Sequence, residues 1–355
     1  MITLHRSVLA GLHGDEPTLT SIRAALQRAI ELEHSTIPVY LYAYFSLDPE
    51  KNGEAASIIK SVVIEEMLHM VLAANVLNAI GGAPSVSHRR FIPTYPSHLP
   101  GGVEGQLTLH LRPFSADQLE AFIEVEEPRD PMDYEAHAAL AEVPSTTIGE
   151  FYLTISRAIE RLPASAFAPA PRRQVGPDLM FGSLLVVDAP TAIGALDTII
   201  QQGEGTASSP EEIDGPGGVN DYSHFYRLSE LKHGRRLVKV PDAPSRQFAY
   251  QFVGDPVIVD PSGIFNLPED PVASDHPAGS PARNQVERFN ATYTTLLGQL
   301  HDLLNGHNDF DTFMVSLRTM SDLEDQARAM ASGARTSGEP VGPSFEYRPA
   351  DPARR

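Results

Sequence analysis

The sequence of 355 residues contains no cysteine and no tryptophan. Without cysteine the chain can form no disulfide bond, thiolate metal site, iron–sulfur cluster or cysteine nucleophile, so any bound metal must have oxygen and nitrogen ligands. Basic residues are also few, and the formal net charge of −19 argues against a nucleic-acid-binding or anionic-membrane-binding surface. We therefore expect a small molecule or another protein as the partner.

Long apolar runs are missing as well. No stretch of about 18 apolar residues occurs, and the N-terminal residues 1–6 do not begin a signal-peptide core. The hydrophobic content of 42% is ordinary for a globular protein. These features predict a cytoplasmic protein that does not enter a membrane.

Helical periodicity dominates the first two thirds of the chain. Apolar residues recur at helical spacing over residues 18–47, 53–80 and 145–162, and a fourth helix is predicted in two parts, 191–202 and 221–233. Pro38 lies inside the first helix and should kink it. Between the second and third helices we expect a long crossover connection with a short helix capped by Ser115. This order predicts a mainly α fold, a four-helix bundle with one long crossover and a split fourth helix.

The remaining chain has a different character. We assign residues 1–237 to the bundle and residues 238–283 to a connection rich in proline and aspartate with short strands. Residues 284–331 regain helical periodicity and predict a C-terminal helical hairpin that packs on the bundle. Residues 332–355 lack an apolar pattern and predict an extended or disordered tail.

The most informative motif is Glu66-Met67-Leu68-His69 in the second helix. Residues three apart in a helix project from the same face, so this carboxylate and imidazole can bind one metal ion. The apolar residues Val62 and Ala73 share that face, which places Glu66 and His69 in a core where unpaired charge is costly. The alternative is a solvated glutamate beside a core histidine.

Further carboxylates lie on the other predicted helices. Glu33 lies on the apolar stripe of the first helix, and Glu204 lies on that of the fourth. His224 opens the second part of the fourth helix, where it could replace the histidine that position 207 lacks. Glu150 is the carboxylate near the start of the third helix, although a role at the helix N-terminus is an alternative for it. Glu126 is a weaker candidate, as a ligand or an arginine partner.

Three segments resemble a known family. Residues 29–41, 65–70 and 75–82 are similar to the ferritin-like domain of the iminophenyl-pyruvate dimer synthase group, which includes the dimer-forming enzymes of violacein and rebeccamycin biosynthesis. Residues 202–205 and 223–228 resemble that group's split fourth helix, which supports pairing Glu204 with His224. Tyr40, seven residues after Glu33, matches the carboxylate–tyrosine spacing of bacterioferritin and is the expected catalytic tyrosine.

The resemblance implies a non-haem di-iron oxidase or oxygenase that acts with O₂ on a small molecule in natural-product metabolism. Iron is the expected metal and manganese the alternative. Imine dimer synthesis, metal storage and a purely structural bundle are the competing functions, and a homodimer is expected from the precedent of helix bundles. A structural bundle would require inward arginine or lysine partners, which the apolar stripes do not show. The expected metal ligands are Glu33, Glu66, His69, Glu150, Glu204 and His224.

Overall fold

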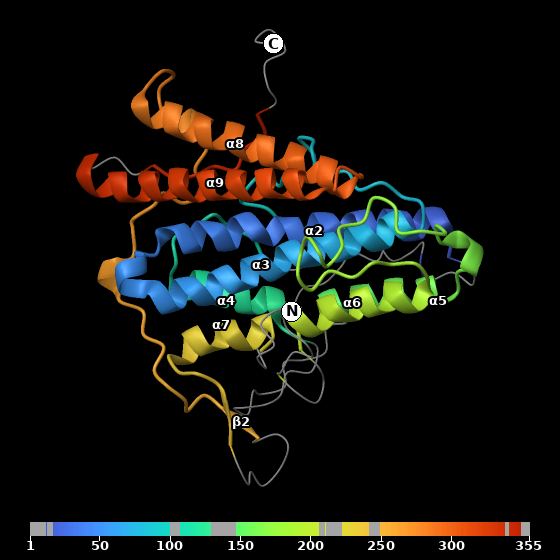
Figure 1. Ribbon diagram of the computed structural model, residues 1–355. Helices are drawn as coiled ribbons and strands as arrows, with labels where there is room; N and C mark the ends of the chain where they lie inside the picture. The colour runs from blue at the N-terminus through green and yellow to red at the C-terminus, as the bar shows by residue number, and fades with distance from the viewer. Residues whose placement is uncertain are drawn as a thin grey trace.

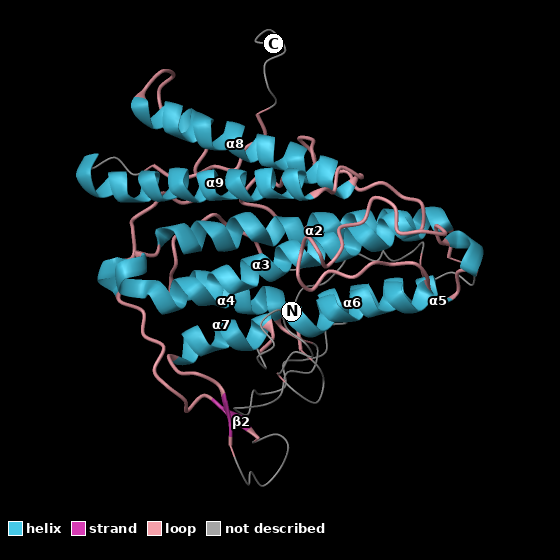
Figure 2. Cartoon of the chain, viewed as in Figure 1, coloured by secondary structure: helices cyan, strands magenta, loops and turns pink. Residues whose placement is uncertain are grey.

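The computed structural model describes residues 12, 17–99, 107–128, 147–205, 210, 222–240, 249–337 and 341–348. Nearly all regular structure within these residues is helical (Figures 1 and 2). Its strands, β1 (Val238–Lys239) and β2 (Tyr250–Gln251), form one short antiparallel pair in which Val238 lies opposite Gln251. Single turns of 3₁₀ helix occur at Ala164–Ala166, Pro261–Gly263 and Ala273–Asp275. The predicted mainly α fold is confirmed.

Helices α2 (Leu19–Ser46) and α3 (Pro49–Ala79) form a long hairpin through the centre of the molecule (Figure 1). The Thr18 hydroxyl caps α2 by accepting a hydrogen bond of 3.1 Å from the Ser21 amide. Helix α2 continues through Pro38. Asn52 interrupts the helical geometry of α3, which is why the apolar periodicity in the sequence begins only after it.

Four shorter helices complete the bundle: α4 (Ala116–Glu126), α5 (Ile148–Glu160), α6 (Ala189–Gly203) and α7 (His224–His233). Helix α4 packs on α7, and α5 packs on α6, at opposite ends of the α2–α3 hairpin (Figure 1). The assignment of α4 to the crossover connection was therefore wrong. Its buried residues Leu119, Phe122 and Ile123 make it part of the bundle, so the third helix is split as well as the fourth.

Both splits fall at the same level of the bundle. Helix α4 ends at Glu126 and α5 begins at Ile148, while α6 ends at Gly203 and α7 begins at His224. Most residues that join these pairs, 129–146, 206–209 and 211–221, lie outside the described residues. The bundle therefore has two different halves. One half is made by α2 and α3, and it faces a half made by α4, α5, α6 and α7, each of which ends or begins at this level.

Helices α8 (Pro281–Leu304) and α9 (Phe310–Ser337) pack against each other and cover α2 on its outer side (Figure 1). In the segment that we expected to be an extended or disordered tail, α9 continues to Ser337 and residues 341–348 lie against α8. Phe345 is buried there, with its ring edge-on to Phe289 and Tyr293. Residues 338–340 and 349–355 lie outside the described residues.

One hydrophobic core extends from α2 to α9 among the described residues. None of the helices in this part of the chain has an apolar stretch sufficient to cross a bilayer.

Candidate metal centre

A first group of ligand-type side chains joins α2 to α3. Oε2 of Glu33 lies 3.4 Å from Nδ1 of His69, and Oε1 of Glu66 lies 3.8 Å from the same nitrogen. All three side chains are almost completely buried. The predicted convergence of Glu33, Glu66 and His69 inside the bundle is thus present in the structure, and these residues form what we term cluster A.

A second group joins α3 to the helix ends of α4 and α7. Nδ1 of His224 lies 3.0 Å from Oε1 of Glu66 and 3.5 Å from Oε2 of Glu126. These three buried residues form cluster B. Because Glu66 belongs to both clusters, its carboxylate lies between His69 and His224, whose rings are 5.3 Å apart. A carboxylate between two such triads has the position of a ligand that bridges two ions.

Both histidines present the same nitrogen to the clusters. Nε2 of His69 lies 3.0 Å from the amide oxygen of Gln202, and Nε2 of His224 lies 3.0 Å from a carboxylate oxygen of Glu65. Both partners are acceptors, so each Nε2 acts as the donor, and Nδ1 is the ring nitrogen that faces the clusters. This arrangement, with an outer acceptor fixing the tautomer, is typical of histidines that bind metals.

A hydroxyl group holds the second oxygen of each cluster carboxylate. Tyr152 donates a hydrogen bond to Oε1 of Glu33. Tyr40 donates to Oε1 of Glu126 at 2.5 Å, and Thr36 donates to Oε2 of Glu66 at 3.0 Å. The oxygens that remain, Oε2 of Glu33, Oε2 of Glu126 and Oε1 of Glu66, are those that face the histidines. The carboxylates are therefore oriented before any ligand arrives.

The charges of the site are unbalanced without a cation. Burial and the neighbouring carboxylates of Glu126 and Glu33 raise the pKa of Glu66 to about 8. Burial opposes protonation of His224, but the carboxylates around it outweigh that effect and raise its pKa well above the usual value. Nδ1 of His224 is buried and makes no hydrogen bond with the described residues. It faces carboxylate oxygens, and this combination of a nitrogen and oxygen atoms fits the ligand set of a metal ion.

Glu65 and Arg227 form a buried ion pair behind cluster B. Arg227 donates to Glu65 and, at 2.8 Å, to the hydroxyl of Ser61. Burial would raise the pKa of Glu65, but His224 and Arg227 together lower it to about 2. The sequence analysis found no inward arginine, and Arg227 is the exception. It neutralises Glu65 rather than a cluster carboxylate, so it does not supply the charge that the clusters lack.

A model of the ferritin-like family matches residues 26–233. The chain belongs to the ferritin-like family. The matched region contains every residue of clusters A and B, so the clusters lie inside the ferritin-like part of the chain. The assignment to the iminophenyl-pyruvate dimer synthase group is finer than this match and stays a prediction.

A solved structure shows the same fold. A ferritin-like protein from Caulobacter vibrioides is 21% identical, and the alignment covers 94% of this chain and 100% of that chain with a TM-score of 0.63. Similarity at this level of identity supports the ferritin-like fold alone. A search of curated proteins found no match.

Two of the predicted ligands lie outside both clusters of this ferritin-like chain. Glu204 directly follows α6 as its C-cap residue, and its Oε1 accepts a hydrogen bond of 2.6 Å from the Gly149 amide at the start of α5. Burial raises the pKa of Glu204 to about 7. Glu150 is half-buried in the first turn of α5, where its own amide bonds the Thr147 hydroxyl. Glu204 nevertheless lines the same small cavity as Glu66 and Glu126, whereas Glu150 does not.

The residue that takes the place we expected for Glu150 is Glu126. The preceding apolar residues Leu119, Phe122 and Ile123 predict its direction, because Glu126 lies three residues after Ile123 and seven after Leu119 on the same helical face. That signal was present in the sequence.

A third group of ligand-type residues, His110, Glu269 and Asp270, lies away from the bundle interior. It is partly exposed, and Arg112 and the amide of Leu111 already satisfy its carboxylates. This group is therefore a surface ion-pair network.

Proposed function

We propose that this protein is a non-haem di-iron oxidase or oxygenase that acts with O₂ on a small organic molecule, in specialised metabolism as the family resemblance implies. The observation that carries the proposal is the sharing of Glu66 between two buried Glu/Glu/His triads. Carboxylate and imidazole donors with few ligands per ion suit iron, and manganese has the same preferences. Two iron ions bound there would supply the electrons that reduce dioxygen.

The protein side chains would divide the remaining work. Glu33 and His69 would hold one ion, Glu126 and His224 the other, and Glu66 both. Tyr152, Tyr40 and Thr36 fix the carboxylates from behind. The role of Tyr40 that its contact supports is positioning Glu126, and its pKa, raised by burial and by Glu126, keeps the donating proton in place.

Glu204 remains a proposed further ligand of the second ion. The end of α6 lies close to cluster B, because a Cβ atom on Gly203 would be 3.6 Å from Oε2 of Glu126. Glu204 would have to release the Gly149 amide in order to turn toward the cluster. Glu150 belongs to neither cluster.

The cavity beside the clusters limits what can reach them. It has a volume of about 20 Å³ and is lined by apolar residues from α2, α4, α5 and α6 together with the cluster carboxylates. That volume holds about one water molecule, so it admits a ligand of the size of dioxygen. The small volume leaves little room for water, which strengthens the electrostatic interactions inside. The organic substrate would therefore react at the rim of this cavity.

The test is metal loading followed by oxygen uptake. The anaerobic protein is reconstituted with Fe(II), iron per chain is measured, and dioxygen consumption is followed with an oxygen electrode. We expect two irons per chain and rapid oxygen uptake for the wild type, both lost in Glu66→Ala and both kept in Glu50→Ala, an exposed carboxylate on the same helix. Uptake of many irons per chain would favour storage. A folded wild type that binds no metal would overturn the proposal.

A further inference from the structure

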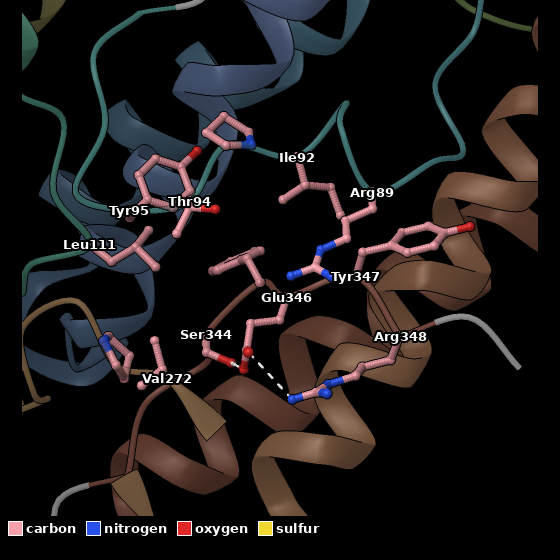
Figure 3. A pocket seen from close by; sticks show the side chains of 13 residues that line it. Arg89, Ile92, Thr94, Tyr95, Leu111, Val272, Ser344, Glu346, Tyr347 and Arg348 are labelled. Carbon is pink, nitrogen blue, oxygen red and sulfur yellow. Dashed lines mark hydrogen bonds and ion pairs between the residues drawn. The ribbon is translucent and has the colours of Figure 1, made fainter. Parts of the chain in front are cut away.

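A second cavity, with a volume of about 430 Å³, lies outside the metal centre (Figure 3). It forms where four parts of the chain distant in the sequence meet: residues 89–95 after α3, Leu111, residues 271–272 before α8, and the C-terminal residues 344–348. No member of clusters A or B lines it. Its volume lies in the range of small-molecule sites.

The walls of this C-terminal pocket are fixed by hydrogen bonds. The amide of Glu346 donates to Oδ1 of Asn290 at 3.0 Å, and the amide of Arg348 donates to the Thr294 hydroxyl at 2.7 Å. These bonds hold the C-terminal segment on α8. On another wall, Tyr95 donates a hydrogen bond of 2.8 Å to the carbonyl oxygen of Ser35 on α2. The pocket is thus preformed rather than a gap between loose loops.

The lining is mostly apolar and partly aromatic. Tyr95, Phe345 and Tyr347 contribute rings, and Ile92, Leu111 and Val272 contribute aliphatic surface. Figure 3 shows Ile92, Tyr95 and Val272 around one open space. Such a surface fits a flat apolar group better than a polar or highly charged one.

The charged residues of the lining are not equivalent. Oε2 of Glu346 accepts hydrogen bonds from the Ala273 amide at 2.8 Å and from the Ser344 hydroxyl at 2.8 Å, and its Oε1 pairs with Arg348 at 3.3 Å. That carboxylate is therefore satisfied within the protein. Arg89 extends into the pocket in Figure 3 and makes no ion pair with the described residues. The pocket thus offers one guanidinium for an incoming anion.

We propose that this C-terminal pocket binds a small organic anion with an aromatic body and a single carboxylate. The carboxylate binds the Arg89 guanidinium, which is suited to two parallel hydrogen bonds with a carboxylate. The ring lies against the apolar wall of the pocket. Inorganic phosphate is excluded as the main ligand, because it would use none of the apolar wall. The site does not depend on the proposed di-iron chemistry, since no residue of cluster A or cluster B lines the pocket.

The test measures binding of 3-phenylpropionate to the iron-loaded protein by calorimetry. The neutral 3-phenylpropanamide tests whether binding needs the negative charge, and inorganic phosphate tests whether binding needs the apolar ring. Arg89→Gln removes the guanidinium, and Arg90→Gln is the matched control, an exposed neighbour that does not line the pocket. Thr94→Trp, at an exposed lining position, fills the space. Melting temperatures confirm that each variant is folded.

We expect the acid to bind, with affinity about tenfold or more weaker for the amide and for Arg89→Gln. Arg90→Gln should bind as the wild type does, and Thr94→Trp should not bind. Binding that survives in Thr94→Trp, equal affinity for acid and amide, tighter binding of phosphate, or no binding of the acid at millimolar concentration would each overturn the proposal. None of these outcomes depends on whether the protein consumes oxygen.

Discussion

The hydroxyl of Tyr40 donates a hydrogen bond of 2.5 Å to Oε1 of Glu126, although the two residues lie on α2 and at the end of α4. The other oxygen of Glu126 lies 3.5 Å from His224. Tyr40 therefore connects the continuous half of the bundle to a carboxylate that stands at a helix end.

Replacement of Tyr40 by phenylalanine should weaken one metal position. Loss of an outer hydrogen bond to a ligand typically reduces metal affinity by about 10-fold to 100-fold. We expect Tyr40→Phe to bind the second iron more weakly by a factor in that range, while the first iron is unaffected. Iron titration under anaerobic conditions measures both steps. Tyr44→Phe is the control, because Tyr44 bonds Glu324 on α9 and not the site; equal effects of the two variants would contradict the assignment.

Loss of a ligand that belongs to one cluster should remove one iron, in contrast to loss of the shared Glu66. We expect Glu33→Ala and Glu126→Ala each to retain about one iron per chain, because each leaves the other triad complete. Glu150→Ala should retain two, since Glu150 lies outside both clusters. Metal analysis after gel filtration gives the numbers. Two irons in Glu126→Ala and one in Glu150→Ala would show instead that Glu150 is a ligand, as the sequence predicts, and that Glu126 is not.

As the pH rises from about 4.5 to 7, the buried carboxylate of Glu204 should lower the stability of the metal-free protein. Its pKa is raised from 4.5 to about 7 by burial, so in this window the folded chain binds a proton that the unfolded chain has lost. The free energy of unfolding then falls as the pH rises, by roughly 3 kcal/mol for this group. We expect Glu204→Gln to be more stable than the wild type at pH 8 and equally stable at pH 4.

Urea unfolding at the two pH values measures this difference. Glu160→Gln, an exposed carboxylate at the other end of α5, should show no such pH-dependent gain. The difference in free energy of unfolding between Glu204→Gln and the wild type is the decisive quantity. If it is the same at pH 8 and at pH 4, the carboxylate of Glu204 is not buried.

Removal of Arg227 should destabilise the fold as well as the site. Glu65 would then be a buried carboxylate that has lost its arginine partner and keeps only His224; breaking a buried ion pair typically costs 3–5 kcal/mol. We expect Arg227→Met to lower the free energy of unfolding by about 3 kcal/mol or more. The double variant Glu65→Gln/Arg227→Met should recover much of that loss. Urea unfolding of the single and double variants checks both statements, and a double variant as unstable as the single one would exclude the pairing.

The sequence predicted the continuous part of the bundle well. Helices α2 and α3 are long and strongly periodic, so Glu33, Glu66 and His69 could be placed on an inner face from spacing alone. The split half was predicted less well. Helix α4 has only 11 residues and is separated from α5 by the unpredicted break, so its Glu126 appeared to belong to the crossover.

Contacts between distant segments could not be predicted at all. Arg227 follows His224 by three residues, which places both on one face of α7, but nothing in the sequence indicates that Glu65 lies opposite. Likewise the C-terminal residues 341–348 carry no periodic pattern, because they pack through single side chains such as Phe345 and through backbone hydrogen bonds to α8.

The unequal construction of the two halves has a consequence for how iron would enter. Cluster A stands on α2 and α3, which are continuous at its residues, whereas cluster B needs the ends of α4 and α7 to be docked beside α3. The two positions should accordingly fill in order, the rigid one first. Substitutions in the segments that join the helix ends would then change the metal affinity of cluster B and leave that of cluster A unchanged. Natural selection could in this way tune the reactivity of the two metal positions without changing the scaffold.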